Sequence, residues 1–291
     1  MELWQVPLSF SRLRMFPFFD LAHYVASVLA LKEQRGVVEV SVRSPLACWF
    51  SAMLYCFGGS VLSSLMLGEP PVAFLAKTIN ILLASSVWYL VFYCPEDIFC
   101  RCFSFLPLRL LVAGMKEVTR TWKITDGIAH ADIVYKDAWL VMVAVGWARG
   151  AGGGLISNFE QLVRGVWKPE TNELLQMSYP VKATLIGAVL FSLQRRQYLP
   201  IARHNLMFLY TIFLVVFKWL LSVPPPEILE DVEDGGQYWN VLPVLLLSLG
   251  NHLELRIKGT HLFCHAWREI RHLEEDMITA ELYKPASYYV K

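Results

Sequence analysis

The sequence has few charged residues for its length. Asp, Glu, Lys and Arg make up only 18% of the 291 residues, and 55% of the residues are hydrophobic. Soluble domains carry about a quarter charged residues. The formal net charge is +1, and no long run of one sign occurs, so no nucleic-acid partner is indicated. The composition predicts more apolar surface than a fold in water can hide.

Several short chemical motifs are also absent. The sequence has no Asn-x-Ser/Thr sequon, and its six cysteines form no C-x-x-C pair, so we expect reduced, buried thiols. No H-E-x-x-H, G-x-S-x-G or P-loop pattern is present. His130 and Asp132 are the best acid–base candidates, but they fall in an expected short loop, Thr125–Asp137, without a partner motif. We therefore predict that the chain is not an enzyme.

Apolar stretches of helical length fill the first 222 residues. A membrane-spanning helix needs about 20 mostly apolar residues. Two stretches contain no charged residue: Ser44–Gly68 and Thr78–Pro95. Five more carry at least one charge: Phe16–Lys32, Phe99–Lys123, Ala138–Phe159, Tyr179–Gln194 and His204–Ser222. The sequence therefore predicts an all-α polytopic membrane protein with seven transmembrane helices in one domain, residues 1–222.

The remaining residues, 223–291, differ in character. They begin with a proline run and an acidic stretch, and Val241–Leu249 is a short apolar segment. Such a segment is too short to span a bilayer. We expect a cytosolic C-terminal tail with a helix on the membrane surface, and a disordered tail is the alternative.

A weak internal repeat divides the spans. Cys56-Phe-Gly-Gly-Ser60 lies midway along the second span, and Gly152-Gly-Gly154 lies midway along the fifth. The pattern suggests repeat one at about 16–95, repeat two at about 99–194, and a seventh span at about 204–222. Because each repeat has three spans, the two copies would have opposite orientations. Inverted repeats with matching interrupted helices indicate a transport path near the membrane midplane.

Four basic residues follow one face of the fourth span. Arg109, Lys116, Arg120 and Lys123 fall within about 60° of one another on a helix, with Glu117 as the expected partner of Arg120. The residues could line an ion pathway, bind an anionic lipid headgroup or sense voltage. The alternative is that the last three reach the membrane interface by snorkelling, whereas Arg109 lies deeper.

Two further groups of residues have open interpretations. Asp20 and His23 share a face of the first span, either as a polar pair at a pore mouth or as a helix-start pair. In Gly146–Gly154, we expect Gly146 and Gly150 to allow close helix packing and Gly152, Gly153 and Gly154 to act as a hinge. Arg149 would then face a polar cavity. The alternative is a packing patch with a snorkelling arginine.

A family resemblance rests on several of these segments. Lys116-Glu-Val-Thr-Arg-Thr-Trp-Lys123 resembles the K-E-V-x-R-x-x-K signature of the trimeric intracellular cation (TRIC) channels, and is most similar to type B. Other matching segments, in order over about residues 9–222, are Met15–Asp20, Asn80–Ser86, Gly146–Gly152, Trp167–Glu170 and His204–Tyr210. The tail departs from the lysine-rich tails usual in the family.

The resemblance implies a homotrimer in the endoplasmic or sarcoplasmic reticulum membrane, with the N-terminus luminal and the C-terminus cytosolic. Lysine and arginine counts alone do not decide this orientation. Each subunit would conduct potassium as a counter-ion for calcium release. An alternating-access transporter on the same inverted-repeat fold is the alternative function, and a non-conducting scaffold is a third.

The resemblance also implies site residues. A phosphoinositide lipid, phosphatidylinositol bisphosphate, is expected at Lys116, Arg120, Lys123, Gly152 and Gly153. The residues expected to line the pore or form its hinges are Asp20, Gly58, Gly59, Arg149, Gly152, Gly153 and Gly154. No metal site and no catalytic residue is expected.

Overall fold

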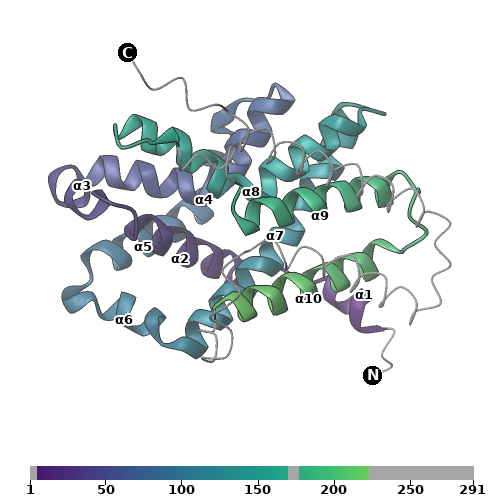
Figure 1. Cartoon of the computed structure of the whole chain (residues 1–291). Coiled ribbons are helices and arrows are strands. Elements are labelled where there is room, and N and C mark those ends of the chain that lie inside the picture. The colour runs from purple at the N-terminus through teal and green to yellow at the C-terminus, as the bar shows by residue number, and fades with distance from the viewer. Residues whose placement is uncertain (1–4, 170–176, 223–291) are drawn as a thin grey trace, which may run out of the picture. The chain divides into compact units, whose positions relative to one another are not determined.

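The computed structural model describes residues 5–169 and 177–222, and within these ranges the chain is helical without strands. The predicted all-α class is confirmed for this part, whereas the tail prediction for 223–291 lies outside it. Figure 1 shows the elements, which are α1 (Val6–Ser11), α2 (Phe18–Lys32), α3 (Val37–Arg43), α4 (Pro45–Leu67), η2 (Pro71–Ala76), α5 (Thr78–Tyr93), η3 (Pro95–Asp97), α6 (Ile98–Ser104), α7 (Leu106–Val134), α8 (Trp139–Val163), α9 (Tyr179–Arg195) and α10 (Arg203–Ser222).

The described helices gather around two hydrophobic clusters. Buried residues of α2, α4 and α5 form most of the first, and buried residues of α7, α8, α9 and α10 form most of the second. The predicted division into two repeats and a seventh span stays a prediction. Contacts of α4 with α8 and of α2 with α7 join the groups. Such pairing of equivalent helices is what an inverted repeat would give, and the inversion itself stays a prediction.

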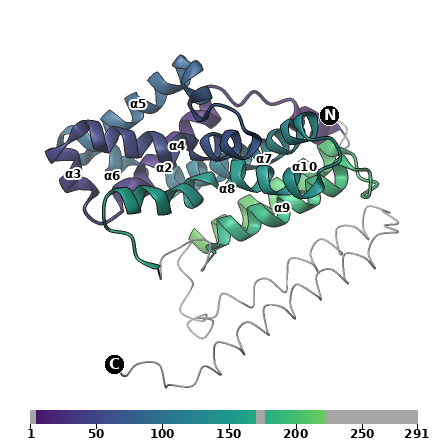
Figure 2. The same ribbon diagram turned by 90° about the horizontal axis from the view of Figure 1, so that it is seen from above.

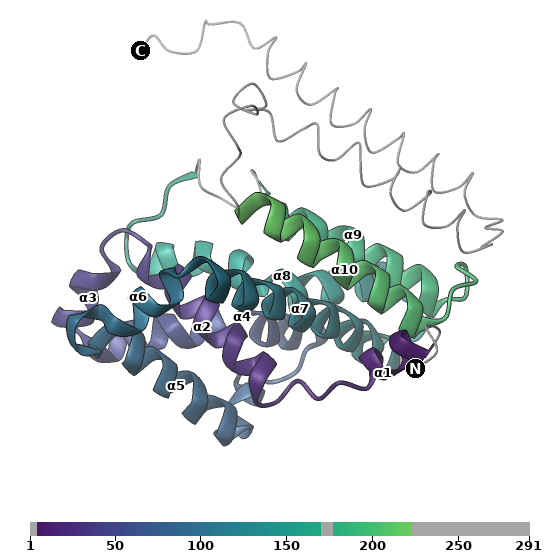
Figure 3. The same cartoon turned by 90° about the horizontal axis from the view of Figure 1, so that it is seen from below.

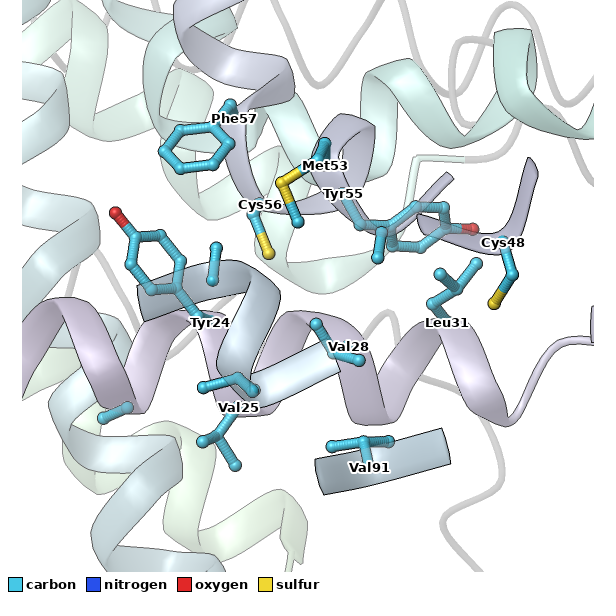
Figure 4. Packing of buried hydrophobic residues seen from close by; sticks show 14 of the residues in the cluster. Tyr24, Val25, Val28, Leu31, Cys48, Met53, Tyr55, Cys56, Phe57 and Val91 are labelled. Carbon is cyan, nitrogen blue, oxygen red and sulfur yellow. The ribbon is translucent and has the colours of Figure 1, made fainter. Parts of the chain in front are cut away.

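The first cluster combines aliphatic side chains with the aromatic rings of Tyr24, Tyr55 and Phe57. Figure 4 shows Val28 and Leu31 of α2 lying between Cys48 of α4 and Val91 of α5. All four side chains are fully buried. The second cluster is similar, and Figure 3 shows α9 and α10 side by side where they contribute to it. Because lipid tails are as apolar as these side chains, van der Waals packing and polar contacts hold the helices together in a membrane.

The contact between α4 and α8 is the most extensive between any two described helices (Figure 2). It is built on glycine. A methyl group added at Gly152 would overlap backbone atoms of Gly59, and one added at Gly58 would lie 2.5 Å from Ile156 Cγ2. On another side of α8, methyl groups at Gly146 and Gly150 would meet Ile128 and Ile124 of α7 at 2.7 and 2.5 Å. The predicted close packing at Gly146 and Gly150 is therefore confirmed.

The structure shows no break at the glycines of α4 and α8, and a hinge role for Gly152, Gly153 and Gly154 stays a prediction. Both α4 and α8 are continuous helices through their glycines, without a residue of non-helical conformation. The glycines serve to bring two straight backbones together, because each lacks the Cβ atom that would separate them. A break is only one use of glycine in a membrane helix, and close approach is the other.

Only some of the helices would cross a bilayer by length and composition alone. Among the described residues, α4 and α8 meet this criterion, and α5 with the bent continuation Pro95–Ser104 makes a third candidate. The helix α2, for example, has 15 residues and a length of about 22 Å, against a hydrocarbon core of about 30 Å. Each of the seven predicted spans contains a helix, but the count of seven transmembrane spans stays a prediction.

The fourth predicted span, Phe99–Lys123, has different bounds in the structure. Its first residues form the separate helix α6, which follows a 99° bend after α5, and α7 begins at Leu106 and continues to Val134. Lys32 at the end of α2 holds this bend. Its ammonium donates to the Val91 carbonyl at 2.8 Å, to Asp97 Oδ1 at 2.7 Å and to Cys100 Sγ at 3.3 Å.

Replacing Gly152 by alanine tests the contact between α4 and α8. We expect Gly152→Ala to lower the stability by about 2 kcal/mol and the melting temperature by about 6 °C, because the methyl group meets backbone that cannot rotate away. Gly153→Ala is the matched control, since its methyl group would lie 3.4 Å from the Tyr55 carbonyl oxygen, an ordinary contact. Thermal unfolding of the purified protein in detergent measures both. Equal melting temperatures for the two variants would contradict the assignment.

Candidate functional site on the basic face of α7

The helix α7 has more helical neighbours than the other spans and carries the predicted basic residues. It contacts α2, α8, α9 and α10, and Figure 3 shows it among them. The sequence places small or polar residues on the faces toward these neighbours, among them Gly114, Thr119, Thr121, Thr125 and Gly127, all buried. Small residues let the helices approach, and the hydroxyl groups can bond to carbonyls of their own turn. Arg120 is therefore buried, and Lys116 and Lys123 are half-buried.

Arg120 is the most completely bonded of the four. Its Nε and Nη2 donate to the two carboxylate oxygens of Glu117 at 2.7 and 3.1 Å, and its Nη1 donates to the Pro180 carbonyl and to Thr184 Oγ1, both at 3.0 Å. The predicted pairing with Glu117 is confirmed. Arg120 is 8% exposed and Glu117 3%, so the snorkelling interpretation is wrong for Arg120. The pair joins α7 to the first turn of α9.

Lys123 turns toward a different neighbour. Its Nζ lies 2.7 Å from Nε2 of His23 on α2, and the same ring nitrogen lies 3.0 Å from the Cys56 carbonyl oxygen on α4. The helix face that carries both Asp20 and His23 thus points into the helix bundle at the position of His23. Asp20 itself lies in the first turn of α2 and is half-buried. The predicted single basic stripe is divided between α9 and α2.

Lys116 makes neither a hydrogen bond nor a salt bridge to the described part of the chain, although its side chain is half-buried. The charges that act on it come from Glu117 and Arg120 on its own helix and from Lys218 on α10. Because both carboxylate oxygens of Glu117 are already engaged by Arg120, the Lys116 ammonium has no direct partner among the described residues. An ammonium in this setting is an anion-binding group.

Arg109 was expected deep in its span, and this is wrong. Because α7 begins at Leu106, Arg109 lies in the first helical turn and is exposed. The sequence could not place the helix start, since the apolar run continues through α6. Arg109 is therefore separate from the enclosed group formed by Lys116, Arg120 and Lys123.

Arg149 on α8 pairs with α7. Its Nη2 lies 2.8 Å from Asp126 Oδ2, and 21% of the arginine side chain is exposed. The pairing depends on the close approach of α7 and α8 at Gly127. A methyl group added at Gly127 would lie only 3.1 Å from Arg149 Cβ and 3.2 Å from Arg149 Cδ. The predicted orientation of Arg149 toward a cavity remains a prediction, as does a pore-lining role for Gly58, Gly59, Gly152, Gly153 and Gly154.

The acid–base candidates do not lie in a loop. The structure places both His130 and Asp132 on α7, which continues through the predicted connector to Val134. His130 Nε2 contacts Glu69 Oε1 at 2.8 Å, and Asp132 Oδ2 accepts from Arg195 Nε at 2.8 Å. Each is half of a separate ion pair, so the two do not form a joint site. Charged residues here made the helix resemble a connector in the sequence.

Sequence reasoning missed a buried ion pair in α8. Glu160 is 1% exposed and accepts from Arg164 at 2.6 and 3.0 Å and from Ser51 of α4 at 2.7 Å. Arg164 also donates to the Arg35 carbonyl at 2.9 Å. The spacing of a glutamate and an arginine four residues apart was the available signal. This pair anchors one end of the contact between α4 and α8.

Comparisons with known proteins agree with this arrangement. A family model described as TRIC channel matches residues 34–223. The chain is 68% identical over 217 residues to trimeric intracellular cation channel type B-B of Xenopus laevis, covering 75% of this chain and 76% of the relative. It is 58% identical over 214 residues to the human type B channel, covering 74% of each.

Solved structures match as well. One, described as the structural basis for activity of TRIC counter-ion channels in calcium release, is 67% identical with a TM-score of 0.74, covering 76% of this chain and 98% of that one. A trimeric intracellular cation channel from C. elegans, in the absence of Ca²⁺, is 37% identical with a TM-score of 0.70, covering 79% and 97%. With a matching family model over most of its length and relatives this similar, the chain belongs to the TRIC channel family.

Proposed function

We propose that this cation channel is a homotrimer that conducts potassium as a counter-ion for calcium release, with one pathway in each subunit. Family membership supports cation conduction, and the relatives are named trimeric and intracellular. A similar solved structure is described as a counter-ion channel in calcium release. We place the protein in the endoplasmic or sarcoplasmic reticulum membrane, with the N-terminus luminal and the C-terminus cytosolic.

The observation that carries the proposal is the enclosure of charge along α7. Glu117, Arg120 and Lys123 point to α9 and α2 instead of to lipid. Ionisable side chains within membrane helices are costly, and those that persist mark ion paths or their regulation. A continuous path for a cation would pass such groups, provided that their positive charge is balanced.

We propose that a bound phosphoinositide balances the positive charge of these side chains. Lys116 supports it, since its ammonium has no direct partner in residues 5–169 and 177–222 and a phosphate is a strong acceptor for such a group. Arg120 differs, because four of its five N–H donors are already engaged by Glu117, Thr184 and the Pro180 carbonyl. We propose that Lys116 binds the headgroup directly and that Arg120 mainly holds α7 and α9 in place. Lys123, Gly152 and Gly153 stay candidates for contact with the lipid.

Recording from planar bilayers tests the channel. We expect the reconstituted protein to give unitary potassium currents of about a picoampere, because an open path passes more than about 10⁶ ions per second, whereas a carrier must change conformation on the microsecond-to-millisecond scale for each cycle. Potassium flux without unitary steps would contradict the channel and favour an alternating-access transporter. An intact trimer without flux would favour a scaffold.

Replacing Lys116 tests the lipid. We expect Lys116→Ala to weaken binding of phosphatidylinositol bisphosphate by about tenfold, since a charge-assisted hydrogen bond contributes about 1.5 kcal/mol. Flotation of the trimer with vesicles that contain this lipid measures the affinity. Lys116→Arg keeps the charge and should retain most of the binding.

Arg109→Ala is the matched control for this measurement. It removes one positive charge from the same helix at an exposed position, outside the enclosed group, and should leave lipid affinity within about twofold. Equal losses for Lys116→Ala and Arg109→Ala would show a general charge effect and contradict the assigned site.

A further inference from the structure

One nitrogen atom at the centre of the helix bundle has two competing partners. Nε2 of His23 lies 2.7 Å from Lys123 Nζ on α7 and 3.0 Å from the Cys56 carbonyl oxygen on α4. Thus a single ring atom links α2 to two other helices.

The proton on this ring decides which partner is bonded. An ammonium group is only a donor, so Lys123 can bond to Nε2 only when that nitrogen carries no proton. A carbonyl oxygen is only an acceptor, so Cys56 can be bonded only when Nε2 does carry one. The two hydrogen bonds therefore exclude each other while Lys123 is charged. The short distance to Lys123 favours the ring with its proton on Nδ1.

The surroundings of His23 are mainly positive. Lys116, Arg120 and Lys123 all act on it from α7, and Asp20 lies one turn earlier on α2, where Lys77 and Lys123 act on that carboxyl group. The helices α4 and α5 contain no Asp, Glu, Lys or Arg, and α4 adds only the thiol and carbonyl of Cys56 at this point. A proton gained by His23 would place a further positive charge among three cations.

We propose that His23 is the positioning residue for Lys123. The neutral ring holds the Lys123 ammonium group against α2. Protonation of the ring releases the ammonium group, and the Nε2–H group then donates to the Cys56 carbonyl oxygen. The proposal rests on the proposed function, since it places the two side chains at the wall of the cation path. Protonation then adds positive charge beside that path. Potassium conduction falls as the medium becomes acidic.

Bilayer recordings across pH test the consequence for conduction. Between about pH 8 and about pH 4.5 we expect the unitary potassium current of the wild-type trimer at fixed voltage to stay constant down to about pH 6 and then to fall by about twofold or more, because burial beside three cations opposes protonation of the ring. His23→Gln should carry a current that does not change over this interval. A glutamine can accept from Lys123 through its oxygen and donate to the Cys56 carbonyl through its nitrogen at every pH, so it keeps both contacts without titrating.

A second histidine provides the matched control. His130 lies on α7 and contacts Glu69, at a half-exposed position away from Lys123. His130→Gln should keep the wild-type pH profile. A pH profile that survives in His23→Gln, or one that is lost in His130→Gln, overturns the proposal.

Nitrogen-15 NMR of labelled histidine in proteoliposomes tests the contact without conduction. At about pH 8, His23 in the wild type should show an unprotonated Nε2. In Lys123→Met the proton should move to Nε2, because the Cys56 carbonyl becomes the remaining partner. A protonated Nε2 in the wild type overturns the proposal whatever the currents are. Absence of unitary current in the wild type contradicts the proposed function instead, and the NMR result then decides the role of His23.

Discussion

The rest of the described fold depends on the close crossing of α4 and α8. In a bilayer, apolar side chains gain little by leaving lipid for protein, so helices associate where their backbones can come near each other. Gly58 and Gly59 on α4 meet Gly152 on α8 with no room for a methyl group. The other side of α8 uses Gly146 and Gly150 in the same way against α7. Thus α8 connects the first group of helices to the second.

This crossing sets the surroundings of the charged residues. With α8 close to both α4 and α7, Glu160 reaches Ser51 and Arg149 reaches Asp126. Glu160 and Arg149 of α8 therefore each meet a partner from another helix. In a medium where an unpaired charge is costly, such partners both stabilise the packing and fix its register.

Three basic residues on α7 have separate environments although their spacing is that of one stripe. Arg120 donates four hydrogen bonds, to Glu117, Thr184 and the Pro180 carbonyl. Lys123 and the Cys56 carbonyl both lie beside Nε2 of His23, and Lys116 has no direct partner in the described part of the chain. The division arises because residues three and four apart on a helix diverge enough to face different neighbours. The proposed lipid headgroup and the ring of His23 would thus be two independent means of adjusting the charge beside one helix.

The amino-acid sequence by itself determined the all-helical class, a helix within each of the seven apolar stretches, and the Glu117–Arg120 pair. Apolar runs and the spacing of three residues are local properties, so no neighbour is needed to recognise them. It did not determine where α7 begins and ends, because the bend after α5 and the ion pairs of His130 and Asp132 depend on other helices. It also could not distinguish a glycine hinge from a glycine contact. Only the tertiary structure showed the contact, since a missing Cβ atom permits either, and the backbone of α4 lies directly against Gly152 of α8.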